Sequence, residues 1–308
     1  MNNDKLPLIL ISAMYENGGN TLHRHLDGHP ELFVYPFESQ LGTRLVNDHL
    51  TSLFPFKYRW PVFPMQGTAE EDFELFFDEE AKTRLRNPAG SKFRDADLQI
   101  QESDRKDIFV ETIQNSERTR GNLVTAFFKA TFKSWKNYNK SGKEKAYVGY
   151  SPIVGVDGES ILKDLPDGHV VHIVRNPYSA YAETKRRPFP MSLKSYVLTW
   201  SLLQHLALTY SSIFPHRFHI IRYEDLVSDT RNVLTGLIEK LGFEFDDSLL
   251  YASWNGKRLD QVYPWGTIRK PSVNTNKETM DTLSDTEKQQ VKSYAHLMIK
   301  EFGYNLNG

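Results

Sequence analysis

Two short stretches of the sequence combine groups that can bind anions. The first is the run Asn-Gly-Gly-Asn-Thr at residues 17–21, which closely follows the apolar run Leu8–Ile11. The second is Arg175, which comes directly after the apolar run at residues 170–174. Glycine permits a tight turn, and a helix that begins after the turn presents free N–H groups and the positive end of its dipole. The planar fork of arginine binds two oxygens of a phosphate at once. Together these stretches predict a site for a nucleotide with separated anionic groups.

Each stretch also has a simpler interpretation. The run at residues 17–21 is compatible with an ordinary strand–turn–helix corner that holds no ligand, and Arg175 is compatible with a surface ion pair to Asp225. A magnesium-dependent nucleotide kinase is disfavoured, because its phosphate loop needs a lysine after the second glycine of the motif, and residues 17–21 contain none.

The elements that must position these groups alternate between strands and helices. Strands are predicted at residues 8–11, 32–35, 146–150, 170–174 and 218–221. The second of these is expected to end at Pro36, and Asn20 or Thr21 is expected to cap the helix after the glycines. Long helices are predicted at residues 192–213 and 282–303. This alternation predicts an α/β fold with a central parallel sheet flanked by helices. Both candidate stretches then lie beyond the carboxyl ends of strands, where such sheets bind ligands.

One region interrupts this pattern. The chain is predicted to be a single domain, residues 1–308, in which about residues 50–115 form an irregular or helical insertion or lid. This region is rich in aromatic residues and proline at first and then acidic, with a helix expected near residues 70–85. A mobile solvated loop is the alternative.

The composition excludes several classes of function. Of the 308 residues, 39% are hydrophobic and 25% are charged, which is typical of a globular protein. The formal net charge of −1 provides no basic field, so no nucleic-acid partner is expected. The chain has no cysteine, which excludes disulfides, thiolate zinc sites and a cysteine nucleophile. No apolar run is long enough to span a membrane, and residues 1–7 are too short and polar for a signal peptide. We therefore expect a cytoplasmic protein without a membrane partner; its oligomeric state is left open.

The ordered motifs resemble those of the PAPS-dependent sulfotransferases, in the bacterial branch of that family, where PAPS is 3′-phosphoadenosine 5′-phosphosulfate. Residues 17–22 and 26–32 look like the family's 5′-phosphosulfate loop and the Asp-Gly-His-Pro element that follows it. Residues 173–181 look like its 3′-phosphate-binding segment, and residues 222–226 match its Arg-Tyr-Glu-Asp-Leu structural segment. The resemblance covers most of the chain outside about residues 50–115. It implies a P-loop-NTPase-like sulfotransferase fold. It also implies transfer of a sulfonate from PAPS to a hydroxyl or amine of a carbohydrate or other small acceptor, with PAP as product and no metal.

Two positions depart from the family's pattern. Asn17 stands where the family usually has a basic residue that contacts the sulfonate, and Glu183 stands where it has a serine. Replacement cations are sought among Lys129, Lys133, Arg269 and Lys270. Replacement hydroxyls are sought at Ser179 and Thr184. The residues that the resemblance predicts to bind the donor are Asn17, Gly18, Gly19, Asn20, Thr21, Arg175, Ser179, Thr184, Arg269 and Lys270.

The resemblance also implies a catalytic base. Glu38 matches the glutamate base of some family members, which would take the proton as the acceptor oxygen attacks the sulfonate in line. The alternative for Glu38 is a carboxylate that stabilises the start of the next helix. His29 is the rival base, although a histidine before Pro30 is expected to satisfy backbone groups of the turn. Residues 263–271 resemble the loop that closes over the donor.

Two functions are therefore open. One is the PAPS-dependent enzyme just described. The other is a sulfotransferase-like module that binds a nucleotide or a sulfated ligand but has lost transfer because of Asn17 and Glu183.

Overall fold

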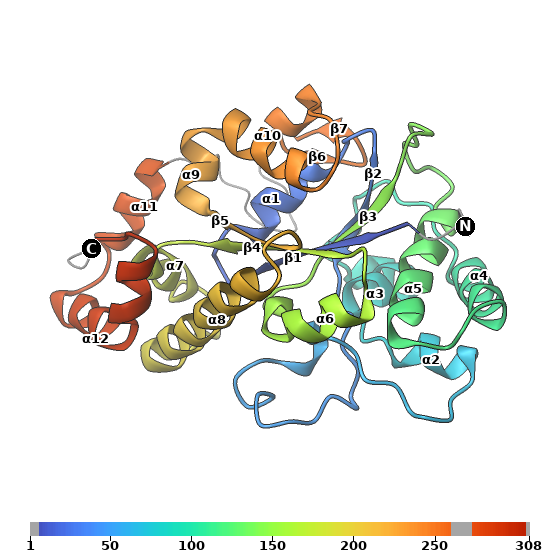
Figure 1. Cartoon of the computed structure of the whole chain (residues 1–308), viewed down its shortest axis with the longest axis horizontal. Helices are drawn as coiled ribbons and strands as arrows, with labels where there is room; N and C mark the ends of the chain where they lie inside the picture. Colours follow the sequence, from blue (N-terminus) through green and yellow to red (C-terminus); the bar gives the residue numbers. More distant parts are fainter. Residues whose placement is uncertain (1–5, 260–272, 306–308) are drawn as a thin grey trace.

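The chain is built on a five-stranded parallel sheet. The computed structural model describes residues 6–259 and 273–305. The strands are β1 (Leu8–Ala13), β2 (Leu32–Glu38), β3 (Ala146–Tyr150), β4 (His169–Val174) and β5 (Phe218–Arg222). They stand in the order β2-β3-β1-β4-β5, and every neighbouring pair is parallel (Figure 1). The predicted α/β fold class is confirmed.

Helices cover both faces of the sheet, with α1, α9 and α10 on one face and α5, α6 and α8 on the other (Figure 1). The first six are α1 (Gly19–Leu26), α2 (Ala69–Leu75), α3 (Glu79–Arg86), α4 (Glu102–Gln114), α5 (Arg120–Ser134) and α6 (Gly158–Asp164). The others are α7 (Pro177–Thr184), α8 (Leu193–Ile213), α9 (Tyr223–Ser228), α10 (Thr230–Lys240), α11 (Val273–Met280) and α12 (Asp285–Glu301). A small antiparallel pair consists of β6 (Ser253–Trp254) and β7 (Lys257–Arg258). The two predicted long helices correspond to α8 and α12.

The strands are buried on both faces, as their apolar runs predict. Along β1, Leu8 and Leu10 join the apolar cluster that includes α5 and α6. Ile9 and Ile11 join the cluster that includes α1, α9 and α10. Side chains alternate between the faces of a strand, so a sheet covered on both sides needs apolar residues at every position. The sheet is thus a rigid platform for the loops at its carboxyl edge.

Strand β2 is longer than its sequence predicts. Its end was expected at Pro36, but the strand continues to Glu38. Proline lacks the N–H group that a central strand needs, and it is tolerated here because β2 is an edge strand. The pairing with β3 is also irregular between Val34 and Glu38. The extension brings Glu38 to the carboxyl edge of the sheet, beside Tyr150 of β3.

Residues 50–115 contain α2, α3, α4 and short turns. The helix predicted near residues 70–85 is divided into α2 and α3, because Asp78 between them takes a left-handed φ of 39°. The Asp78 carboxylate accepts hydrogen bonds from Tyr35 of β2, at 2.7 Å, and from Arg105 of α4, at 2.6 Å. All three side chains are buried. This buried network joins the region to the sheet.

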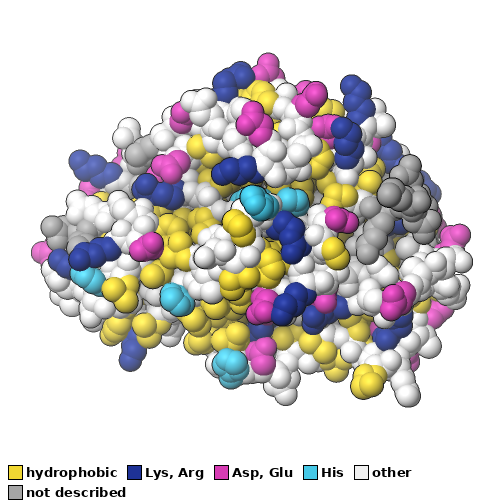
Figure 2. All heavy atoms as spheres, in the orientation of Figure 1, with side chains coloured by type: hydrophobic (Ala, Val, Ile, Leu, Met, Phe, Trp, Pro, Cys, Tyr) yellow, Lys and Arg dark blue, Asp and Glu magenta, His cyan; other side chains and the backbone are white. Residues whose placement is uncertain are grey.

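Two further observations concern the surface. Within residues 6–259 and 273–305, no helix is both long and apolar enough to cross a membrane. On the face seen in Figure 2, basic and acidic side chains are interspersed. The cytoplasmic location and the expected lack of nucleic-acid and membrane partners stay predictions.

Candidate active site

The loop after β1 turns into α1 without a side-chain cap. Glu16 and Gly18 take left-handed φ values of 60° and 91°, and Gly18 is the N-cap of α1. Asn20 and Thr21, which were predicted as possible caps, lie inside the first turn instead. The backbone hydrogen bond from Leu22 N–H to Gly18 O, at 3.1 Å, is the first of the helix, so the N–H groups of the first turn have no helical acceptor. Together with the helix dipole they can bind an anion.

Both glycines of this loop make room for aromatic rings at neighbouring strand ends. A Cβ atom at Gly19 would lie 2.4 Å from the ring of Tyr150. A Cβ atom at Gly18 would lie 2.3 Å from the ring of Tyr223. The loop therefore needs glycine for its packing against β3 and α9, and at Gly18 also for its backbone conformation.

Asn17 uses its whole side-chain amide inside the protein. Its Oδ1 atom accepts hydrogen bonds from the Arg175 backbone N–H, at 2.9 Å, and from Trp200 Nε1, at 3.0 Å. Its Nδ2 atom donates to Tyr15 O, at 2.9 Å, and to Tyr196 Oη, at 3.1 Å. The side chain is fully buried. Asn17 thus ties the loop to the end of β4 and to α8.

Arg175 lies between β4 and α7 and is joined to the same loop. Its Nη1 atom donates to Glu16 O at 3.0 Å, and its Nε atom donates to Asn276 Oδ1 at 2.7 Å. The guanidinium carbon lies 4.8 Å from the ring centroid of Tyr223. The Nη2 atom is buried and has no hydrogen-bond partner among residues 6–259 and 273–305. A buried donor without an acceptor costs about 1–3 kcal/mol, so this atom is suited to the oxygen of an anion.

Ser179 and Arg175 both bind Asn276. The Ser179 hydroxyl donates to the backbone oxygen of Asn276 at 2.9 Å. Asn276 of α11 therefore presents one oxygen to Ser179 and another to Arg175, as a phosphate group would. The Thr184 hydroxyl donates to Ala180 O at 3.0 Å, and it also forms a hydrogen bond with the Tyr196 side chain of α8. The role of Thr184 as a replacement hydroxyl stays a prediction.

The segment at residues 222–226 forms hydrogen bonds to the residues around Arg175. Glu224 Oε1 accepts from Asn176 N–H at 3.0 Å and from Asn276 Nδ2 at 2.7 Å. Asp225 Oδ1 lies 3.8 Å from Arg222 Nη1, and the guanidinium of Arg175 binds Glu16 O and Asn276 Oδ1 instead of the alternative partner Asp225. The segment has the structural role that its motif implies.

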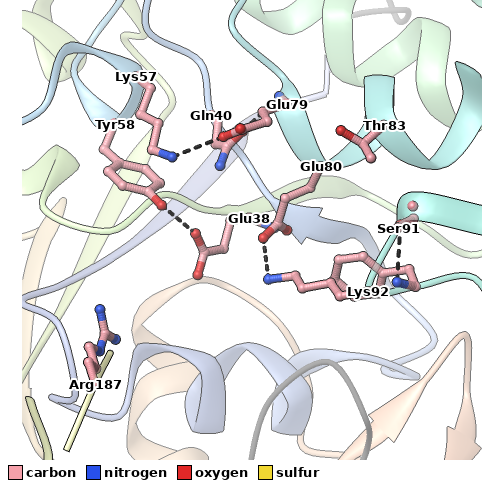
Figure 3. A pocket seen from close by; sticks show the side chains of 12 residues that line it. Glu38, Gln40, Lys57, Tyr58, Glu79, Glu80, Thr83, Ser91, Lys92 and Arg187 are labelled. Carbon is pink, nitrogen blue, oxygen red and sulfur yellow. Dashed lines mark hydrogen bonds and ion pairs between the residues drawn. The ribbon is translucent and has the colours of Figure 1, made fainter. Parts of the chain in front are cut away.

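Glu38 opens onto a cavity of about 470 Å³ at the end of β2 (Figure 3). Tyr58 Oη donates to Glu38 Oε2 at 2.8 Å. The Glu38 backbone N–H donates to Glu80 Oε2 at 3.0 Å, and Glu80 also forms an ion pair with Lys92. Arg187 lines the cavity as well, and Figure 3 shows Glu38 between Arg187 and Glu80. Other polar residues of the lining are Gln40, Lys57, Glu79, Thr83 and Ser91.

Three groups in or near the cavity have pKa values that are shifted from their ordinary values. Burial, and then the negative charge of Glu38, raise the pKa of the Glu80 carboxyl. Burial and the same charge raise the pKa of the Tyr58 hydroxyl well above its ordinary value. They also raise the pKa of Tyr15 to about 12. Both tyrosines therefore stay protonated at neutral pH, and Tyr58 can only donate to Glu38.

The chain is similar to known sulfotransferases in sequence profile and in fold. The profile of the "Sulfotransferase family" matches residues 7–247, which is more than half of the chain. The chain belongs to the sulfotransferase family. The predicted family is thus confirmed, and membership supports sulfonate transfer as the general activity. No curated protein matches the chain in sequence.

Three solved structures that are similar to this sulfotransferase are described as sulfotransferases. The sulfotransferase domain from the Synechococcus PCC 7002 olefin synthase is 20% identical, with a TM-score of 0.49, over 90% of this chain and 95% of that chain. The sulfotransferase domain from the curacin biosynthetic pathway is 19% identical, with a TM-score of 0.48, over 98% and 99% of the two chains. The sulfotransferase STF9 from Mycobacterium avium is 12% identical, with a TM-score of 0.47, over 99% and 78%.

The structure does not bring His29 to the active edge of this sulfotransferase. His29 precedes β2, at the amino edge of the sheet, whereas Glu38 ends that strand. The ring is used by the backbone: Nδ1 accepts from Glu31 N–H at 3.2 Å, and Nε2 lies 2.9 Å from Glu244 O. Burial lowers the pKa of His29. Of the two proposed bases, only Glu38 lies at the edge that carries the glycine loop.

The cations suggested as replacements for a basic loop residue fall into two groups. Arg269 and Lys270, with the rest of the predicted closing loop at residues 263–271, lie outside the described residues. Lys129 and Lys133 lie on α5, which packs against the sheet and α4, and neither is part of the described lining of the Glu38 cavity.

Several residues of the sulfotransferase site were missed by sequence reasoning. They are Glu16, Tyr58, Glu80, Lys92, Arg187, Glu224 and Asn276. Most come from the insertion, from the α7–α8 connection or from α11, far in sequence from the two anion-binding stretches. No local pattern marks them, apart from Glu224 within the Arg-Tyr-Glu-Asp-Leu segment.

Proposed function

We propose that this sulfotransferase transfers a sulfonate group from PAPS to a hydroxyl or amine of a polar small acceptor, such as a carbohydrate. The observation that carries this proposal is the buried Nη2 atom of Arg175 beside Ser179, which has no hydrogen-bond partner in the described part of the chain. It supplies an anion-binding group at the same sheet edge as the free N–H groups of α1. The donor has two such anionic groups, a 3′-phosphate and a 5′-phosphosulfate.

The residues present fit this donor. Arg175 and Ser179 would hold the 3′-phosphate, taking its oxygens where they now bind the oxygens of Asn276. The first-turn N–H groups of α1, at Gly19, Asn20 and Thr21, would hold the 5′-phosphosulfate. When bound, PAPS supplies an activated sulfonate with PAP as its leaving group.

Glu38 is the base in this proposal. The acceptor oxygen or nitrogen forms a bond to sulfur as the bond from sulfur to the 5′-phosphate oxygen breaks, and the acceptor proton passes to the Glu38 carboxylate. Tyr58 holds that carboxylate by a hydrogen bond of 2.8 Å and so fixes its direction. Much of the remaining catalysis is positioning and charge stabilisation, as in phosphoryl transfer.

The cavity favours a polar acceptor. Its lining carries carboxylates at Glu38, Glu79 and Glu80 and amines at Lys57 and Lys92. Hydroxyl groups of a sugar can exchange hydrogen bonds with such a lining, whereas an apolar ring would desolvate charges without replacing their partners.

The test begins with ligand binding. Thermal shift of the whole chain is measured with PAP, PAPS, ATP and buffer, because a ligand that binds only the folded state raises the melting temperature. We expect PAP and PAPS to raise it more than ATP does. Radiolabelled PAPS with sugar, amine and phenol acceptors then tests transfer. If PAP neither binds nor raises the melting temperature, the proposed donor is contradicted.

A second candidate function is a nucleotide-binding module without transfer. The observation that favours it concerns Asn17, at the position of the family's basic residue. Its side-chain amide makes four hydrogen bonds within the protein. Tight PAP binding with no labelled acceptor would support this candidate against the enzyme.

A further inference from the structure

A cation from a distant part of the chain lies over the glycine loop. Arg187, in the connection between α7 and α8, donates from Nε to Glu16 Oε1 at 2.8 Å. Its guanidinium carbon is 5.4 Å from the ring centroid of Tyr15, in the same loop. Glu16 therefore has two functions: its backbone oxygen holds Arg175 and its carboxylate holds Arg187.

The same arginine also borders the cavity of Glu38. Arg187 is part of the cavity lining, on the side of Glu38 away from Glu80 (Figure 3). The other cations of the described lining are Lys57 and Lys92, which pair with Glu79 and Glu80 of α3. Within the described part of the chain, Arg187 is thus the lining cation that contacts the glycine loop.

The position of Arg187 matters because the glycine loop has no basic side chain of its own. Residues 14–22 contain no basic side chain, and their one charged residue is Glu16. A carboxylate next to an anion-binding helix start repels the anion, and backbone N–H groups alone carry only partial charges. The Arg187 guanidinium neutralises Glu16 and still has further N–H groups to donate.

We propose that Arg187 is the cation that binds the 5′-phosphosulfate of the donor, and that Glu16 is a positioning residue that holds it over the glycine loop. This inference rests on the proposed function. The ion pair is exposed enough to rearrange, since the Arg187 side chain is 44% exposed and the Glu16 side chain 33%. Placed between the loop and Glu38, Arg187 faces the oxygen on which charge develops as the sulfonate leaves the 5′-phosphate.

The test separates the two ends of the nucleotide. Affinities for PAP and for adenosine 3′-phosphate, which lacks the 5′-anion, are measured by calorimetry for the wild type, Arg187→Ala and Arg187→Lys. We expect Arg187→Ala to weaken PAP binding roughly 10- to 100-fold, the range for losing a charged hydrogen bond, and to leave adenosine 3′-phosphate within about twofold. Arg187→Lys should recover part of the loss. Arg186→Ala, a neighbouring arginine paired with Glu183 at 3.4 Å, is the matched control and should bind like the wild type.

A second comparison asks whether Arg187 acts directly. In the Glu16→Gln background the charge that Arg187 neutralises is gone, while the amide oxygen can still accept a hydrogen bond from Arg187 and hold it over the loop. A purely indirect effect of Arg187→Ala on PAP binding would therefore vanish there. Persistence of the loss in that background supports direct contact, and its disappearance overturns it. Equal loss for both nucleotides, or wild-type PAP binding by Arg187→Ala, also overturns the role of Arg187 while leaving the proposed donor intact. A wild type that does not bind PAP overturns both.

Discussion

The side chains of Asn17, Arg175 and Ser179 around the glycine loop are buried and engaged with other residues of the protein, whereas the lysines of the Glu38 cavity are paired nearer the surface, as is the Glu16–Arg187 pair between the two regions. On the first side, Asn17, Arg175 and Ser179 are at most 6% exposed. On the second, the Lys57 and Lys92 side chains are 29% and 44% exposed. We call these the nucleotide side and the cavity side.

This difference has consequences for binding and for chemistry. Buried groups that are fixed by hydrogen bonds are already in place when a ligand arrives, so little ordering is needed and the geometry is specific. Exposed ion pairs contribute little to stability and can exchange their partners for those of a ligand. We infer that the nucleotide side determines which donor binds and that the cavity side determines acceptor choice and turnover.

The largest expected effect is on turnover, from a change on the cavity side. Glu38→Gln keeps the shape of the side chain and removes its basicity. Turnover should fall by about 10²–10⁴, the usual contribution of a general base, while PAP affinity stays within a few-fold. Both are measured on the same preparation, with radiolabelled PAPS and a PAP titration.

Tyr58→Phe is the matched control for Glu38. It removes the hydrogen bond to the carboxylate but leaves the base, so the loss of turnover should be about tenfold or less. Wild-type turnover by Glu38→Gln would show that Glu38 is not the base, and a large loss of PAP binding would place it on the nucleotide side.

The next effect is on donor binding, from a change on the nucleotide side. Arg175→Ala should weaken PAP binding by about 2–4 kcal/mol, the range for truncating a buried charge pair. Binding of adenosine 5′-phosphosulfate, which lacks the 3′-phosphate, should change little. Calorimetry with both nucleotides checks this, with circular dichroism to verify folding. Equal losses for the two nucleotides would contradict the assignment of Arg175 to the 3′-phosphate.

The two sides also differ in what could be predicted from sequence. Residues 17–21 and Arg175 follow buried strands directly, so their place at the sheet edge follows from the order of the elements alone. Glu38 was recognised by its position after the His-Pro element. Its partners Tyr58 and Glu80 come from the insertion, and only tertiary packing brings them to β2.

Asn17 shows why local patterns are insufficient even on the nucleotide side. In the sequence, Asn17 stands where the family usually has a basic residue. In the structure, its side-chain amide is buried and makes four hydrogen bonds. Two of its partners, Tyr196 and Trp200, belong to α8 and are 179 and 183 residues away in the chain. Likewise Pro36 is a strand breaker in most contexts, and only its edge position explains why β2 continues to Glu38.

A smaller effect is expected at the boundary of the nucleotide side. Asn276 occupies Arg175 and Ser179 with its two oxygens, so a phosphate must displace it. Asn276→Ala should therefore tighten PAP binding several-fold and lower the melting temperature without ligand, because hydrogen bonds to Arg175 and Glu224 are lost. Calorimetry and thermal denaturation of the free protein measure the two effects. Weaker PAP binding would instead show that Asn276 contributes to the phosphate site.

The smallest effect concerns the pH dependence of stability on the cavity side. The raised pKa of Glu80 means that the folded protein binds this proton more tightly than the unfolded chain does. Stability from the protonated carboxyl is fully present below the unfolded pKa of about 4.5 and is lost as the pH rises through the higher folded pKa. Glu80→Gln mimics the protonated form and keeps an oxygen for the Glu38 N–H.

The melting temperatures of wild type and Glu80→Gln should therefore be similar at pH 4 and diverge towards pH 7, with the variant higher. Glu79→Gln is the matched control, because Glu79 is the neighbouring carboxylate, its side chain is 54% exposed and its ion pair with Lys57 lies at the surface. It should show no such divergence. A gap of the same size at both pH values would mean that Glu80 acts through packing and not through its charge. A less stable variant at pH 7 would mean that the ion pair with Lys92 outweighs burial and the repulsion from Glu38, and that the cavity side is as firmly built as the nucleotide side.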